Sequence, residues 1–123
     1  MRPESFDYLA KARECLDAAT MINALPLPQV AAKETYLAAY HAAHAFVFES
    51  TSKVVKSHSG MRTMFANVAK GDPRLDRTLA SLLGRAYEFK EVADYGVGSQ
   101  AVVTAKEAQD VIEIAQRFVD TIT

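Results

Sequence analysis

Apolar residues in the segment 75–93 recur at alternating spacings of four and three positions. These residues are Leu75, Leu79, Leu82, Ala86, Phe89 and Ala93. Because an α-helix turns once in about 3.6 residues, this spacing places all of them on one face and predicts an amphipathic helix. Gly96 and Gly98 follow the segment and are expected to end the helix.

The sequence Gly71-Asp72-Pro73 is expected to separate this helix from a shorter one before it. Gly71 would end the shorter helix in the left-handed conformation, Asp72 would cap the next helix, and Pro73 would occupy its first position. We expect the shorter helix to be capped by Ser57 or Ser59 and to continue to about residue 70.

Three further helices are predicted by the same reasoning, over residues 3–24, 30–52 and 104–122. In the first, the residues expected to face inward are Phe6, Leu9, Ala12, Leu16, Ala19 and Ile22. In the second, Leu37, Tyr40, His44 and Val47 form a stripe flanked by alanines. In the last, Ala108, Val111, Ala115, Phe118 and Ile122 face inward. Thr104 and Glu107 have the spacing of a capping box, and Glu113 is expected to pair with Arg117.

The composition agrees with an entirely helical fold. Alanine occupies 21 positions, glycine and proline together only 9, and no strand pattern competes with the helical ones. We therefore predict an all-α fold, an antiparallel four- or five-helix bundle that forms a single domain over residues 1–123.

Several classes of protein are excluded by simple counts. A single cysteine, Cys15, cannot form an intrachain disulfide and is interpreted as structural. No apolar run approaches the roughly 18 residues that a membrane span needs. Residues 1–5 lack the core of a signal peptide. We expect a cytoplasmic protein with no membrane partner.

Charge is distributed unevenly along the chain. Residues 53–90 contain eight basic and three acidic side chains, whereas 1–52 contain four and six, and 91–123 contain two and six. A basic middle segment can mark a surface for anions or nucleic acid. The alternative is that the helices pack together and neutralise one another's charges.

The segment from Lys53 to Arg62 combines a histidine with several cations just before a predicted helix. Lys53, Lys56 and Arg62 surround His58 in the sequence. Such an arrangement can bind a phosphate through charge and free backbone N–H groups. It is also what metal-free RNA cleavage requires, since the imidazole moves a proton while a cation stabilises charge on phosphorus. The alternative is that Ser57 and His58 cap the helix and the lysines are solvated.

The remaining titratable residues give weaker indications of a binding or catalytic site. His41 and His44 lie three positions apart, but the chain contains neither Glu-x-x-His nor His-Glu-x-x-His and offers no obvious third ligand. We therefore expect no metal site and no cofactor. Asp94 lies near a helix C-terminus, where an acidic residue is unfavourable, and so calls for a specific partner. Together with Tyr95 it could equally form a structural corner.

Three short motifs resemble those of the HEPN (higher eukaryotes and prokaryotes nucleotide-binding) family. They are Tyr40-His41-Ala42-Ala43-His44-Ala45-Phe46, His58-Ser59-Gly60 and Ala93-Asp94-Tyr95, followed by an amphipathic helix. The most similar branch comprises small prokaryotic proteins with an aromatic-His-Ala-Ala-Arg helix, a His-Ser-Gly turn and an Arg-x-x-Ala-Asp-Tyr motif. The resemblance covers about residues 6–122.

The resemblance implies a four- or five-helix bundle that dimerises and, in many members, a minimal nucleotidyltransferase as partner in a toxin–antitoxin or defence module. Active members are metal-independent endoribonucleases that use an Arg-x4–6-His pair. Here no arginine precedes a histidine by five to seven positions, and Lys53, five before His58, is the nearest analogue. His44 and Lys90 stand where the branch has its two motif arginines. The positions that match the branch are His41, His58, Asp94 and Tyr95.

Three functions are consistent with these observations. The first is a HEPN-like homodimer that binds RNA or a nucleotide, pairs with a nucleotidyltransferase and lacks the usual ribonuclease site. Its binding residues would be Lys56, Arg62, His41, Lys90, Asp94 and Tyr95. The second is an active metal-independent endoribonuclease with His58 and Lys53 as catalytic residues, assisted by Lys56 or Arg62. The third is a non-catalytic structural protein that docks a partner.

Overall fold

A computed structural model describes residues 1–96 and 103–123 of the chain, and every regular element in these ranges is a helix. The helices are α1 (Pro3–Ala24), α2 (Pro28–Thr51), α3 (His58–Lys70), α4 (Arg77–Ala80), α5 (Leu82–Tyr95) and α6 (Ala105–Ile122). The predicted all-α fold class is therefore confirmed.

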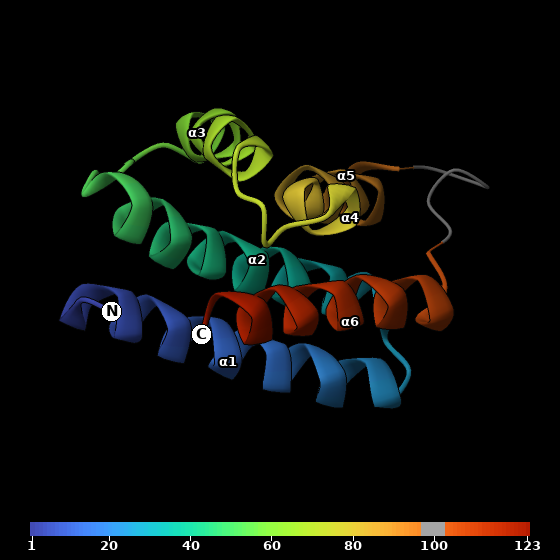
Figure 1. Ribbon diagram of the computed structural model, residues 1–123. Helices are drawn as coiled ribbons and strands as arrows, with labels where there is room; N and C mark the ends of the chain where they lie inside the picture. Colours follow the sequence, from blue (N-terminus) through green and yellow to red (C-terminus); the bar gives the residue numbers. More distant parts are fainter. Residues whose placement is uncertain (97–102) are drawn as a thin grey trace.

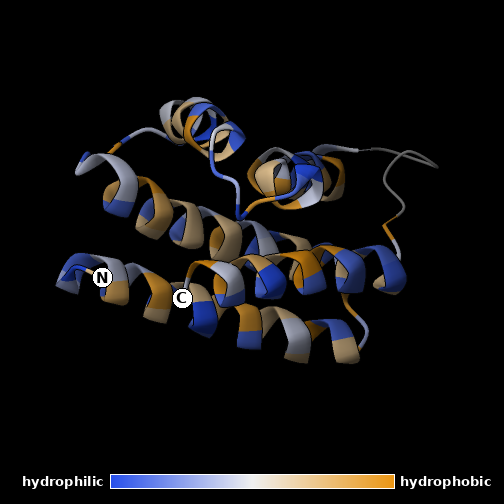
Figure 2. Ribbon diagram, in the orientation of Figure 1, coloured by the Kyte–Doolittle hydropathy of each residue, from blue (hydrophilic) through white to orange (hydrophobic). Residues whose placement is uncertain are grey.

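The helices form two layers. The long helices α1, α2 and α6 lie side by side, with α1 antiparallel to α2 (Figure 1). The shorter helices α3, α4 and α5 lie across the other side of α2 (Figure 1). Hydrophobic and hydrophilic residues are interspersed along each helix, as amphipathic packing requires (Figure 2). Among the described helices, none is long and apolar enough to cross a membrane.

The core joins the two layers through three aromatic side chains. Phe46 of α2, Phe65 of α3 and Phe118 of α6 meet edge to face, with ring centroids 5.6–5.8 Å apart. All three are at most 2% exposed. Edge-to-face contact is favoured because the positive ring edge faces the negative ring face, so this cluster ties α3 and α6 to α2.

The alanines of α2 allow close helix packing inside the chain. Seven of them are at most 1% exposed: Ala31, Ala32, Ala38, Ala39, Ala42, Ala43 and Ala45. Small side chains let the backbone of a neighbouring helix approach closely. This alanine face is therefore occupied within the chain and is not available to a second copy, so the expected homodimer needs another surface.

In α1 the buried face begins one residue earlier than the spacing predicts. Phe6 was expected to face inward but is 55% exposed, whereas Ser5 is completely buried. Ser5 lies four residues before the buried Leu9. Because each residue turns the helix by about 100°, the inward position falls to the small serine and Phe6 points outward.

The turn between α3 and α5 differs from its prediction. Gly71 has φ −91° rather than a left-handed conformation. Asp72 accepts hydrogen bonds from the backbone N–H and the guanidinium of Arg74 instead of capping a helix. The capping residue is Asp76, which accepts from Leu79 N at 2.8 Å. The predicted single helix is interrupted at Ser81, between α4 and α5. Of the two glycines expected to end it, Gly96 is the C-cap residue and Gly98 lies outside the described residues.

Capping predictions succeeded at two other helices. Ser57 caps α3 by accepting from Gly60 N, and Thr104 caps α6 by accepting from Glu107 N. The predicted Glu113–Arg117 pair was wrong, because Arg117 instead forms an ion pair with Asp76. This pair connects α6 to the start of α4, a contact between segments that spacing along one helix cannot indicate.

Candidate functional site

The His-Ser-Gly sequence is explained by the way in which helix α3 begins. Ser57 Oγ accepts a hydrogen bond from Gly60 N at 3.0 Å and so caps the helix. A Cβ atom at position 60 would lie only 2.6 Å from Ser57 Oγ and 3.0 Å from Val55 Cγ1. Glycine is therefore the residue that leaves room for this cap. The cap in turn places His58 as the first residue of α3.

The imidazole of His58 is held by two tyrosines of α2. The Tyr36 hydroxyl lies 2.8 Å from His58 Nδ1, within hydrogen-bond distance. The Tyr40 ring stacks on the imidazole, with centroids 4.1 Å apart and planes at 10°. Burial raises the pKa of Tyr36, with Arg62 opposing the shift, so the hydroxyl keeps its proton at neutral pH. With Nδ1 engaged, Nε2 is the ring nitrogen left for a ligand.

His58 opens into a cavity of 480 Å³ between α2, α3 and α5, which we call the histidine pocket. Its lining residues are Lys33, Tyr36, Leu37, His58, Ser59, Arg62, Tyr87, Lys90 and Glu91. Three cations thus surround one cavity together with the histidine. A cavity of this size is in the range of small-molecule sites, about 300–1,000 Å³.

Two of the cations are held in place by their neighbours. The Arg62 guanidinium lies over the Tyr87 ring, 3.7 Å from its centroid. Lys90 Nζ lies 3.3 Å from Asp94 Oδ2 and 3.7 Å from Glu91 Oε1. Lys90 is thus the specific partner expected for Asp94. Within the described part of the chain, neither Lys33 nor Arg62 takes part in an ion pair.

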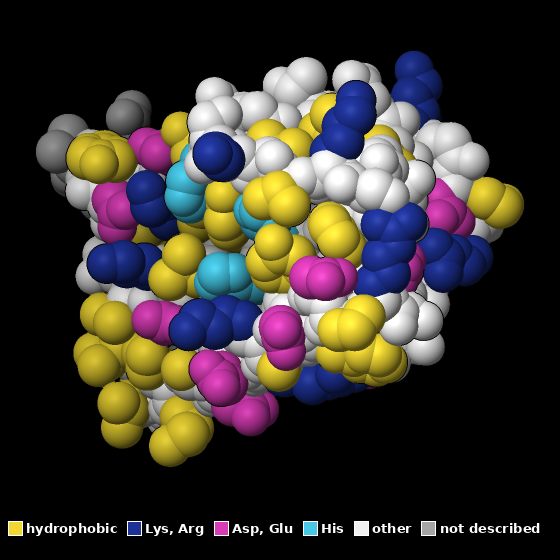
Figure 3. Space-filling view, turned by 90° about the vertical axis from the view of Figure 1, so that its left-hand side faces the viewer, with side chains coloured by type: hydrophobic (Ala, Val, Ile, Leu, Met, Phe, Trp, Pro, Cys, Tyr) yellow, Lys and Arg dark blue, Asp and Glu magenta, His cyan; other side chains and the backbone are white. Residues whose placement is uncertain are grey.

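The other two histidines do not line the pocket but contact Tyr40, the ring that stacks on His58. Histidine side chains gather on one face among hydrophobic ones, with both basic and acidic side chains around them (Figure 3). The ring of His44 lies 4.9 Å from both Tyr8 and Tyr40, and its Nδ1 is buried without a hydrogen-bond partner among the described residues. Burial lowers the pKa of His41 and of His44; Lys11 and His58 add to the shift at His41, and His41 and His58 add to it at His44. In the described ranges, no group of three or more His, Cys, Asp or Glu side chains could hold a metal ion.

The structure brings together only some of the predicted site residues. His58, Arg62 and Lys90 line the same pocket, and Asp94 and Tyr95 contact Lys90, the latter with its ring 5.7 Å from Nζ. Lys53 and Lys56 are exposed in the segment before α3 and are not among the residues that line the pocket. His41 is half-buried against Tyr40.

Sequence reasoning missed Lys33, Tyr36 and Tyr87 as pocket residues. A signal for Tyr36 was present, because Tyr36, Tyr40 and His44 follow one another at spacings of four along α2. No comparable signal marks Lys33 or Tyr87, because both reach the pocket only through the packing of α2 against α5.

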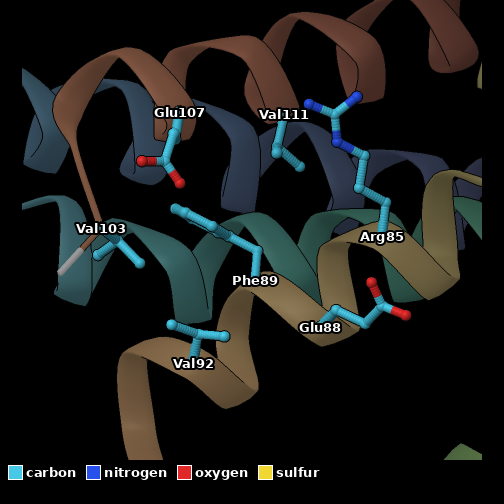
Figure 4. Close-up of a pocket in the computed structure, with 7 residues that line it drawn as sticks. All are labelled: Arg85, Glu88, Phe89, Val92, Val103, Glu107 and Val111. Carbon is cyan, nitrogen blue, oxygen red and sulfur yellow. The ribbon is translucent and has the colours of Figure 1, made fainter. Parts of the chain in front are cut away.

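A second cavity, of 230 Å³, lies between α5 and α6. Phe89 reaches from α5 toward α6 there, with Val92, Val103 and Val111 around it (Figure 4). Its charged residues are one arginine, Arg85, and two glutamates. It contains neither a histidine nor an excess of cations, so the histidine pocket is the better candidate for binding an anion.

Comparison with known proteins identifies the family of the chain. A model of the HEPN domain matches residues 6–123, nearly the whole chain. The chain belongs to the HEPN family. A relative, UPF0332 protein glr0978 of Gloeobacter violaceus, is 28% identical over 118 residues, which cover 96% of this chain and 92% of the relative. The HEPN resemblance that the three short motifs suggested is therefore confirmed.

Proposed function

We propose that this HEPN protein binds RNA or a nucleotide through phosphate groups at the histidine pocket. The observation that carries the proposal is that Lys33, Arg62 and Lys90 line the same cavity as His58. Cations bind phosphate by charge, and arginine adds a planar pair of donors that matches phosphate oxygens. Membership of a family named for nucleotide binding agrees with this assignment.

Aromatic groups beside the cations suit an unpaired nucleotide. The His58 ring is exposed on α3, with Tyr40 stacked on it. Proteins that bind single-stranded nucleic acid combine a positive surface with rings on which bases stack. The exposed imidazole supplies such a ring next to the cations of the pocket.

We also propose that the chain acts in a cytoplasmic toxin–antitoxin or defence module with a nucleotidyltransferase partner, as a homodimer. The support is the likeness of its motifs to the prokaryotic HEPN branch. Co-purification with a nucleotidyltransferase encoded beside the gene and light scattering of the purified chain test the two parts separately. A monomer at all concentrations would contradict the second part.

The binding proposal is tested by titrating a labelled single-stranded RNA with the protein at several salt concentrations. Each contact to a phosphate releases counterions from the RNA into solution. Because this release is less favourable at high salt, binding weakens as the salt concentration rises. We expect Arg62→Gln to weaken binding. The slope of log affinity against log salt concentration should decrease by about one or less, because one phosphate contact is lost. Lys70→Gln is the matched control, since Lys70 lies about 12 Å further along α3. Equal effects of the two variants would contradict the assignment.

A second candidate, metal-independent ribonuclease activity, is favoured by one observation. Tyr36 and Tyr40 orient the imidazole of His58 and leave Nε2 free to move a proton. Against it, Lys53, the nearest analogue of the usual arginine, is not among the residues lining the pocket. We therefore propose a protein without the usual Arg-x4–6-His site. Incubation with RNA in excess EDTA, beside a His58→Ala variant, separates the two: cleavage lost in the variant would favour the enzyme.

A further inference from the structure

We infer that the histidine pocket recognises a terminal phosphate, a phosphomonoester, in preference to the phosphodiesters inside a strand. This inference rests on the proposed function and narrows it to one chemical class of ligand. The phosphate could belong to the end of an RNA or to a free mononucleotide, because both present the same group.

Two cations of the pocket are free to bind a doubly charged anion. Three cations and one carboxylate, Glu91, line the pocket, and Asp94 lies outside the lining, 3.3 Å from Lys90 Nζ. Lys33 and Arg62 take part in none of the ion pairs between described residues, so no carboxylate holds either of these two cations. A phosphomonoester carries about −1.5 to −2 charges at pH 7, whereas a diester carries about −1. The monoester, with the larger charge, is therefore attracted more strongly to these two cations than a diester is.

The arrangement of the cations also favours one phosphate over a row of them. Lys33 lies on α2, Arg62 on α3 and Lys90 on α5, so the three line a single cavity from three sides. A strand of diesters would need cations that follow its backbone along a groove. The lysines that could extend such a row from α3, Lys53 and Lys56, lie in the segment before the helix and outside the pocket lining.

The contacts of Arg62 prepare it for a group with several free oxygens. Its guanidinium carbon lies over the Tyr87 ring, 3.7 Å from the centroid, a contact that restricts its orientation. A guanidinium held in this way presents two parallel N–H donors to two oxygens. Ser59 and His58 line the same cavity, and the serine hydroxyl or the Nε2–H of the imidazole can donate to a third oxygen. A terminal phosphate has three such oxygens, and a diester has two.

The test compares three versions of one short single-stranded RNA: with a 5′-phosphate, with a 3′-phosphate, and with hydroxyl groups at both ends. We expect one phosphorylated version to bind at least tenfold tighter than the hydroxyl version. In Lys33→Gln and in Arg62→Gln this preference is lost, whereas Lys70→Gln retains it. Lys33 is exposed, so its variant keeps the fold, which circular dichroism verifies.

The outcomes separate this inference from the proposed function. Equal binding of all three RNAs would overturn the terminal-phosphate inference and leave RNA binding in place. Binding of none of them, together with no binding of adenosine monophosphate, would overturn both. Competition by adenosine monophosphate as strong as that by the phosphorylated RNA would identify a free nucleotide as the source of the phosphate, and competition by the RNA alone would identify the strand end.

Discussion

Replacing Gly60 with alanine tests whether the cap at the start of α3 is built as described. The new Cβ atom would lie 2.6 Å from Ser57 Oγ, so the hydroxyl must rotate away and release Gly60 N. Loss of a serine cap costs about 1 kcal/mol, in a range of about 0.5–2. Alanine in a helix is favoured over glycine by about 0.5–1 kcal/mol, which offsets part of this cost. We expect Gly60→Ala to leave the free energy of unfolding unchanged or to lower it by about 1 kcal/mol.

Gly84 provides a matched control. It is the third residue of α5, as Gly60 is of α3, but a Cβ atom there meets nothing within 4 Å. Gly84→Ala should therefore raise the free energy of unfolding by about 0.5–1 kcal/mol, from helix propensity alone. The two variants should differ by about 0.5–2 kcal/mol, a difference that comes from the cap and not from the amino-acid exchange.

A double-mutant cycle identifies the contact that causes this difference. Ser57→Ala should cost about 1 kcal/mol by itself, because it removes the same cap. In that background Gly60→Ala no longer displaces a hydroxyl, so it should become stabilising, with a coupling of about 1 kcal/mol between the two sites. Urea unfolding followed by circular dichroism measures all five proteins, because the chain contains no tryptophan for fluorescence. Equal stabilisation by Gly60→Ala and Gly84→Ala would refute the reasoning.

Three further predictions concern the core, acid stability and the α4 cap. Phe118→Ala should lower the free energy of unfolding by about 3–5 kcal/mol, because it leaves a cavity in the aromatic cluster that joins α2, α3 and α6. A loss below about 1 kcal/mol in urea unfolding would contradict that packing. Burial, together with His41 and His58, lowers the pKa of His44 in the folded protein. The stability that depends on neutral His44 should therefore be full above the unfolded pKa of about 6.5. It should decrease as the pH falls below that value, because the unfolded chain then takes up a proton that the folded chain does not. His44→Leu should show a smaller loss between pH 7 and pH 5 in the same assay, and an unchanged pH dependence would exclude His44 as a source. Asp76→Ala should cost about 1–2 kcal/mol, as it removes both the cap of α4 and the partner of Arg117, and Asp76→Asn should recover the part due to the cap.

The positions of the helices were largely predictable because helical periodicity is a local property of the chain. The buried apolar face of 75–93 and the caps at Ser57 and Thr104 agree with the structure, since a helix face and its cap involve residues close in the chain. The single helix predicted for 75–93 is instead two, α4 and α5. The errors concern packing against other parts of the chain, which the spacing along one helix does not specify. Phe6 was assigned to the wrong face by one position, and Arg117 was given a partner on its own helix.

The candidate site shows what the sequence by itself determined and what it could not. The short motif at 58–60 identified His58 and the turn that presents it, because Ser57 and Gly60 are its immediate neighbours. Which cations face His58 was decided only when α3 and α5 packed across α2. That packing brought in Lys33 and Tyr87 and left Lys53, five residues away in the chain, outside the pocket. Periodicity specifies the face that a helix buries, but the angle and depth at which two helices cross depend on the side chains that meet between them.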